Sequence, residues 1–173
     1  MVLSGQKTEW TLIFLMLTVL IILSAVPVLA QDQAVERRYL SITPGAETAF
    51  YSLTGPAFGG GLSLAYGNRI SLGLKAVFFA DIKSLLNVLE LNVLFRYYFI
   101  SSHTGPFIQF SGGPALFFRQ DNSIDLPADW GIISAGVSLG WRFFIGKTFF
   151  IEPSIRGGYP YLGGAGLAAG VHF

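Results

Sequence analysis

Few side chains of this sequence could carry covalent chemistry. There is no cysteine among the 173 residues, which excludes a thiolate nucleophile, a thiolate metal site and a disulfide-stapled fold. The candidate general bases are the two histidines, His103 and His172. An enzyme would need a nucleophile within hydrogen-bond reach of such a base, and no lipid-facing Ser–His–Glu set can be drawn from the strand-like segments described below. We therefore predict no catalytic residue and no cofactor.

The acidic and glycine-rich segments contain no metal or phosphate motif. Asp121, Asp125 and Asp129 lack the spacing of a calcium-binding loop, so we interpret them as a solvated acidic segment. The glycines at 59–61 and 163–164 lie within strand-like patterns, where they permit close packing or bulges. The 11 basic and 10 acidic residues give no charge signature of nucleic-acid binding. We predict no metal site and no nucleic-acid partner.

A second group of polar side chains recurs at alternate positions within apolar segments. In 88–99, Glu90, Asn92 and Arg96 alternate with large apolar residues. Successive side chains of a strand point to opposite faces, so these three share one face. The same pattern predicts a set of inward-facing charged and polar residues: Glu47, Lys75, Glu90, Asn92, Arg96, Arg142, Glu152 and Arg156.

Positioning these residues requires strands, and the sequence has eight segments of period two, each about ten residues long. That length and pattern are typical of membrane-spanning strands. The predicted strands are Tyr39–Glu47, Phe58–Tyr66, Ile70–Phe79, Val88–Phe99, Phe107–Arg119, Gly131–Phe143, Phe149–Tyr159 and Gly163–Phe173.

The composition favours a membrane protein that is not helical. Hydrophobic residues make up 52% of the chain, charged residues only 12%, and the mean hydropathy is +0.57. A membrane helix needs about 20 mostly apolar residues. The longest charge-free stretch after residue 30, 97–118, is interrupted by proline and glycine. The remaining structure that satisfies every backbone group in lipid is a closed barrel, so we predict an all-β, eight-stranded, antiparallel, up-and-down transmembrane barrel. A soluble barrel is the alternative, which the shortage of charge disfavours.

The first thirty residues have the pattern of a secretory signal peptide. An apolar run, 11–23, precedes Val28 and Ala30 at the −3 and −1 positions of a small-residue cleavage site. We predict a cleavable signal peptide over 1–30 and a barrel domain over 31–173. An uncleaved anchor is the alternative, because 11–30 is about long enough to span a bilayer.

The predicted connections and aromatic residues define two ends of the barrel. The connections 67–69, 101–105 and 145–148 are short and mark an inner end; 48–57, 81–87 and 120–130 are longer and mark an outer end. Aromatic residues gather near both ends, as in the girdles of membrane barrels. We assign to the inner girdle Tyr66, Tyr97, Phe99, Phe107, Phe143, Phe149 and Phe173, and to the outer girdle Phe50, Tyr51, Phe58, Phe78, Phe118, Trp130, Tyr159 and Tyr161.

The last residues, GLAAGVHF, carry a family resemblance. Apolar residues alternate back from Phe173 at Val171, Ala169 and Leu167. This pattern resembles the assembly signal of bacterial outer-membrane barrels. Together with the signal peptide and eight strands, the chain resembles the small barrels of the OmpX, OmpA transmembrane-domain and OmpW type. The resemblance implies export to the bacterial outer membrane, with outer-membrane lipid and the barrel-assembly machinery as partners.

An eight-stranded barrel is just wide enough for side chains to fill its lumen. Buried charges there must be paired. Hairpin counting gives three groupings: Lys75 beside Glu90 or Asn92, Arg142 beside Glu152, and Arg156 with Glu47 in the outer half of the lumen.

Three functions are compatible with such a barrel. The first is a non-enzymatic envelope protein whose outer loops act as a surface antigen or adhesin, with host or extracellular ligands. The second is an OmpW-like narrow channel for small or hydrophobic solutes, which the inward-facing Phe79, Leu94, Phe117, Ile132 and Phe150 would suit. The third, remote alternative is an outer-membrane lipid-modifying enzyme.

Overall fold

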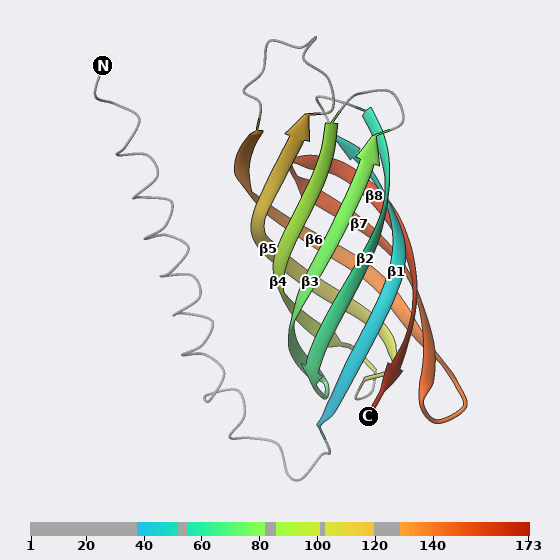
Figure 1. Cartoon of the computed structure of the whole chain (residues 1–173). Helices are drawn as coiled ribbons and strands as arrows, with labels where there is room; N and C mark the ends of the chain where they lie inside the picture. Colours follow the sequence, from blue (N-terminus) through green and yellow to red (C-terminus); the bar gives the residue numbers. More distant parts are fainter. Residues whose placement is uncertain (1–37, 52–54, 82–85, 101–102, 120–128) are drawn as a thin grey trace, which may run out of the picture. The chain divides into compact units, whose positions relative to one another are not determined.

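The computed structural model describes residues 38–51, 55–81, 86–100, 103–119 and 129–173, and the predicted signal peptide 1–30 lies outside them. Eight antiparallel strands close into one barrel in sequence order (Figure 1), which confirms the predicted fold. Among the described residues, no helix is long and apolar enough to cross a membrane. The strands are β1 (Tyr39–Tyr51), β2 (Gly55–Gly67), β3 (Ile70–Asp81), β4 (Leu86–Tyr98), β5 (Gly105–Arg119), β6 (Asp129–Ile145), β7 (Phe149–Tyr159) and β8 (Tyr161–His172).

Several strands extend further toward the outer end than the alternation predicts. β1 and β2 stay paired as far as Tyr51 and Gly55, so the predicted connection 48–57 shrinks to 52–54. A short bend at Pro160 joins β7 to β8. The backbone explains the extension, because each additional pair satisfies amide and carbonyl groups that would otherwise lack partners. The other two predicted outer connections, 81–87 and 120–130, lie mostly outside the described residues, because 82–85 and 120–128 are not described. Asp121 and Asp125 belong to the second of these segments.

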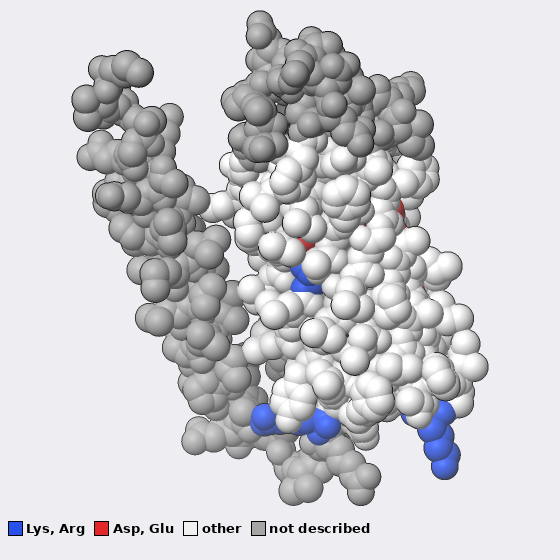
Figure 2. Space-filling view, in the orientation of Figure 1, with Lys and Arg blue, Asp and Glu red and all other residues white. Residues whose placement is uncertain are grey.

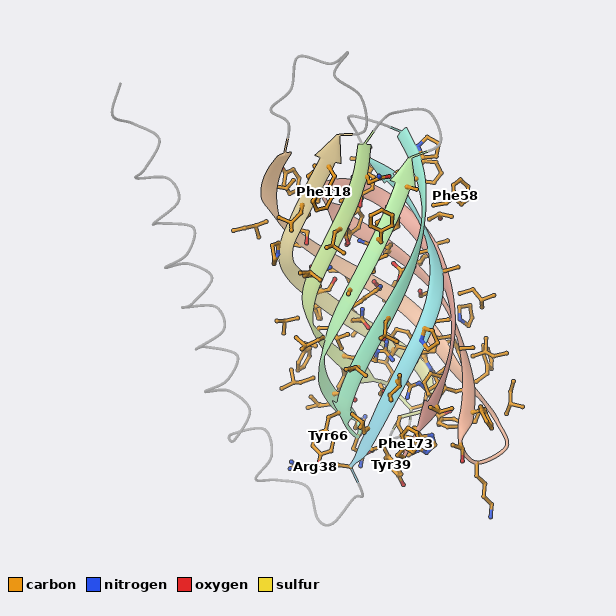
Figure 3. All side chains as sticks on the ribbon, in the orientation of Figure 1. Arg38, Tyr39, Phe58, Tyr66, Phe118 and Phe173 are labelled. Carbon is orange, nitrogen blue, oxygen red and sulfur yellow. The ribbon has the colours of Figure 1, made fainter. Side chains whose placement is uncertain are left out.

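The outer wall of the barrel is apolar. Alternation directs one side chain outward and the next into the lumen, and outward residues such as Leu74 and Leu167 are 61% and 60% exposed. Figure 3 shows Phe58 and Phe118 on the wall near the outer end, and Tyr66 and Phe173 near the inner end. The inner end is where β1 begins and β8 ends (Figure 1).

The girdle assignment is wrong for three aromatic residues. Tyr51, Phe107 and Tyr161 are buried in the lumen. Tyr51 has the same parity as Glu47, so its strand directs it inward. Tyr161 points inward because the pairing of β1 with β8 shifts register between Phe50 and Tyr51, and a bulge changes which side chains face each way.

Glycines make room for the aromatic residues that point into the lumen. A Cβ on Gly136 would lie 1.8 Å from the Tyr161 hydroxyl, and one on Gly170 would lie 2.5 Å from the Phe150 ring. Atoms cannot approach so closely, so a larger residue at either position would displace the ring. Small residues on the lumen face therefore allow a narrow barrel to hold large side chains.

The seam between β1 and β8 depends on a threonine hydroxyl. The two strands pair Glu47 with Gly166 and Phe50 with Gly163, with Thr48 between them. The Thr48 hydroxyl donates to the Ala165 carbonyl at 3.2 Å and accepts from the Ala165 amide at 3.1 Å. A side chain therefore satisfies two backbone groups on the outer wall of the barrel, where unsatisfied groups are costly in lipid.

Replacing Thr48 with valine is expected to lower the free energy of unfolding by about 1–3 kcal/mol, because valine has the same shape and cannot bond to Ala165. Urea unfolding of the vesicle-inserted protein, followed by tryptophan fluorescence, would measure the change. Thr48→Ser retains the hydroxyl and is the matched control. Equal stability of T48V and wild type would show that the seam does not need this hydroxyl.

Candidate functional site

The barrel lumen contains all eight predicted polar residues, which come from β1, β3, β4, β6 and β7. Six of them are buried, from Glu90 at 0% to Arg156 at 8% exposed, and Glu47 and Lys75 are nearly so. They form two clusters at different heights. We call them the outer cluster (Glu47, Lys75, Glu90, Asn92, Arg156) and the inner cluster (Arg96, Arg142, Glu152).

Arg156 is the centre of the outer cluster. Its guanidinium contacts Glu47 at 2.7 Å and Glu90 at 2.7 Å, while Lys75 forms an ion pair with the other oxygen of Glu47. Two cations and two carboxylates therefore balance. Paired, hydrogen-bonded charges are the form in which ionised groups can be held in an interior.

Neutral side chains complete the hydrogen bonding of the outer cluster. The Tyr51 hydroxyl donates to Glu90 at 2.7 Å, and the Asn92 amide donates to Glu90 at 3.4 Å. Ser134 on β6 donates to the Asn92 carbonyl oxygen at 2.8 Å. The network thus crosses the lumen from β1 to β6.

Glu152 is the centre of the inner cluster. One of its oxygens accepts from Arg96 at 2.6 Å and also from Nε of Arg142. Arg96 donates in addition to the Gln109 side-chain oxygen, at 2.7 Å and 3.1 Å, and to the Tyr98 hydroxyl at 2.9 Å. This cluster has two cations to one carboxylate.

Aromatic rings cover the guanidinium groups, a role that the alternation of residues in the sequence does not predict. Arg142 lies 3.8 Å from the Phe150 ring centre and Arg156 lies 3.7 Å from that of Tyr161. Arg96 lies 4.2 Å from the centre of a third ring, that of Phe107. Cation–π contacts of this kind stabilise a desolvated cation. For Phe107 and Phe150 the signal in the sequence was lumen parity on the strand next to that of the arginine, whereas Tyr161 has the opposite parity and gave no such signal.

The ion pairs differ in part from hairpin counting. Arg142 and Glu152, which counting places side by side, form an ion pair, and so do Arg156 and Glu47. Lys75 lies opposite Asn92 in the register, but its ion-pair partner is Glu47. Glu90 instead forms an ion pair with Arg156, which reaches it across the lumen from β7. In a narrow lumen, long side chains reach past their paired strand.

An apolar layer closes the lumen on the outer-end side of the outer cluster. Tyr51 is at its centre and makes edge-to-face contacts with Phe79, Phe117 and Tyr161. Ile132 packs against the layer from β6. The buried members are Ala49, Tyr51, Ala57, Val77, Phe79, Val88, Ala115, Phe117 and Tyr161.

A cavity of about 40 Å³ lies at the level between the clusters. Both clusters contribute to its walls, through Lys75 and Glu47 on one side and Arg96 and Glu152 on the other. Serine and threonine hydroxyls complete the lining. This volume is enough for a few water molecules.

The two histidines lie at the inner mouth. The His103 and His172 rings are 5.2 Å apart and pack against Tyr39 and Phe144. Among the described residues, no group of three or more His, Cys, Asp or Glu side chains is arranged to hold a metal ion.

Three of the four predicted assembly residues lie on β8, and the fourth, Phe173, directly follows it. Leu167, Ala169 and Phe173 are exposed, and Val171 is half-buried. Phe173 and Leu40 exchange backbone hydrogen bonds of 2.9 Å and 3.2 Å. The barrel is therefore closed up to the last residue of the sequence.

No protein-family model matches the chain, and neither does any curated protein sequence. Among solved structures, the N-terminal β-barrel domain of Pseudomonas aeruginosa OprF matches with a TM-score of 0.57 and 19% identity over 78% of this chain and 97% of that one. Neisserial surface protein A (NspA) matches with 0.52 and 17% over 81% and 98%. Ail of Yersinia pestis, solved with the heparin analogue sucrose octasulfate, gives 0.46 and 15% over 79% and 97%. The first two matches show that the chain has the fold of the small bacterial outer-membrane barrels.

Proposed function

We propose that this protein is an integral barrel of the bacterial outer membrane, exported by a signal peptide over residues 1–30, whose closed lumen makes it a structural and surface protein rather than a channel or an enzyme. The observation that carries the proposal is the filled lumen. Two ion-paired clusters and an apolar layer occupy successive levels of it.

The apolar wall supports a membrane location. Large apolar side chains cover the outside of all eight strands, and Figure 2 shows a wall that is almost entirely white. Soluble monomers rarely expose contiguous apolar patches of more than a few hundred Å². Lipid removes that cost, and the barrel leaves no strand edge unpaired.

The packing of the lumen supports a closed barrel. Water and ions following the axis would meet Glu90 and Arg156, which are bonded to each other and buried. Toward the outer end, beyond these two side chains, water and ions would meet the rings around Tyr51. Displacing either level would separate buried charges or open a packed apolar layer, both of which are costly.

A surface role would depend on the outer loops. These connect strands whose ends lie away from the inner mouth, and on this proposal they face the exterior as an antigen or adhesive surface for host or extracellular ligands. The histidines, at the inner mouth, are distant from that surface, which argues against lipid-modifying chemistry at the outer leaflet. The barrel-assembly machinery is the proposed partner of Leu167, Ala169, Val171 and Phe173.

Planar-bilayer recording of the purified protein tests the closed lumen. We expect no stable conductance steps from a preparation whose insertion is verified by heat-modifiable migration on a gel. Regular conductance from the same preparation would overturn the proposal. It would favour the second candidate, an OmpW-like narrow channel for small or hydrophobic solutes, for which the polar cavity beside Lys75 and Arg96 is the supporting observation.

A further inference from the structure

Cations outside the lumen gather at the inner end of the barrel. Arg38 precedes β1, Arg69 lies in the β2–β3 turn and Lys147 in the β6–β7 turn. We call these three residues the basic rim. Figure 2 shows blue side chains along the lower edge of the barrel. Among the described acidic residues, Glu47, Glu90 and Glu152 point into the lumen, and Asp81 and Asp129 are the outer-end residues of β3 and β6.

The Arg69 side chain lies against the outer wall of the barrel at the inner end. Its Nε donates to the Tyr98 carbonyl and its Nη2 to the Phe99 carbonyl, each at 3.3 Å. Its guanidinium also lies 5.4 Å from the ring centre of Tyr97, an inner-girdle residue. The cation is therefore positioned at the girdle and not at the mouth of the lumen.

Exposed apolar side chains adjoin each cation of the rim. Lys147 lies between Ile145 and Phe149, which are 57% and 61% exposed. Figure 3 shows Arg38 beside Tyr66 at the same end. A cation directly beyond an apolar band is placed where lipid phosphates meet acyl chains, and its own methylenes can lie along the apolar surface.

We propose that the basic rim binds the headgroups of anionic phospholipids, such as phosphatidylglycerol, in the inner leaflet in preference to zwitterionic ones. The inference rests on the proposed membrane location and adds the lipid class. A zwitterionic headgroup carries its own cation, which offsets its attraction to arginine and lysine. A net anionic headgroup lacks that cation, and each basic residue near the bilayer surface is then worth about a fivefold preference.

Brominated phospholipids provide a direct test, because they quench tryptophan on contact. Trp141 lies on the lipid-facing side of β6 and is 43% exposed; β6 leads into the turn that holds Lys147. The full chain with W10F and W130F has Trp141 as its single tryptophan. Quenching would be measured in vesicles that mix brominated phosphatidylglycerol with plain phosphatidylcholine, and in the converse mixture. The ratio of the two gives the relative affinity of the lipids.

Because Trp141 reports on the lipid nearest Lys147 alone, we expect its quenching to show a preference of about fivefold for phosphatidylglycerol, and we expect the preference to disappear in R38Q/R69Q/K147Q. Salt at about 1 M should also remove it, because the screening length falls to about 3 Å. R119Q, which removes a cation at the outer end of β5, is the matched control and should keep the preference. Equal quenching by both lipids in wild type, or an unchanged preference in the triple variant, would overturn the inference.

Three further outcomes distinguish a lipid site from other roles of the basic rim. A chain that inserts into both kinds of vesicle without preference contradicts the lipid site and leaves the proposed membrane location intact. A chain that inserts into neither contradicts the location itself. If the triple variant keeps its lipid preference and instead loses co-sedimentation with peptidoglycan, the rim serves the cell wall and the lipid assignment is wrong.

Discussion

Glu152→Ala is expected to lower the free energy of unfolding by about 3–5 kcal/mol, the largest effect of any single lumen substitution considered. The Glu152 carboxylate is the acidic partner of both Arg96 and Arg142, which are 5% and 3% exposed. Its removal leaves two buried guanidinium groups that no other carboxylate in the inner cluster neutralises. Urea unfolding of the vesicle-inserted protein, followed by tryptophan fluorescence, would give the free energy.

Two controls make the Glu152 prediction specific. Ser154→Ala alters the next lumen-facing residue of β7, which lines the same cavity, and should change stability by no more than about 0.5 kcal/mol. Arg96→Met in the E152A background removes one of the two unpaired cations, so the double variant should recover part of the loss. An E152A barrel within about 1 kcal/mol of wild type would show that water in the lumen, not Glu152, compensates the arginines.

The strand pattern could be predicted because burial in this barrel has a simple period. On β4, residues of one parity point into the lumen and those of the other lie on the outer wall, so Glu90 and Arg96 had to share a face. Glycine on the lumen face was also informative, since Gly170 leaves space for the Phe150 ring of the neighbouring β7. These properties belong to one strand or to neighbouring strands, which is the range that sequence periodicity covers.

Other features depend on how strands face each other across the lumen. The partner of Lys75 could not be found by hairpin counting, because Glu47 lies two strands away and reaches it through the interior. The inward direction of Tyr161 depends on a register shift between β1 and β8, the two strands furthest apart in sequence. Such contacts are set by barrel diameter and stagger, which no local pattern specifies.

Deleting Phe173 is expected to abolish assembly of the barrel in cells. Phe173 combines two properties in the structure. Its backbone completes the β8–β1 pairing with Leu40, and its ring is 68% exposed on the outer wall. An exposed apolar ring at a strand terminus adds little to folding and is available to a partner. Membrane fractions of cells expressing the variant, tested for the heat-modifiable folded band, should contain almost none of it.

The cause of that loss can be resolved by comparing assembly in cells with refolding in vitro. The two backbone bonds at Leu40 are a small part of the β1–β8 ladder, so the deletion variant should still fold into vesicles from urea, with a stability loss of about 1–2 kcal/mol. Phe173→Trp retains an aromatic ring and the backbone, and should assemble in cells like wild type. Failure in cells with success in vesicles assigns Phe173 to recognition by the assembly machinery. Failure in both assigns it to closure of the barrel, and normal heat-modifiable migration of the deletion variant from cells would refute the assembly signal.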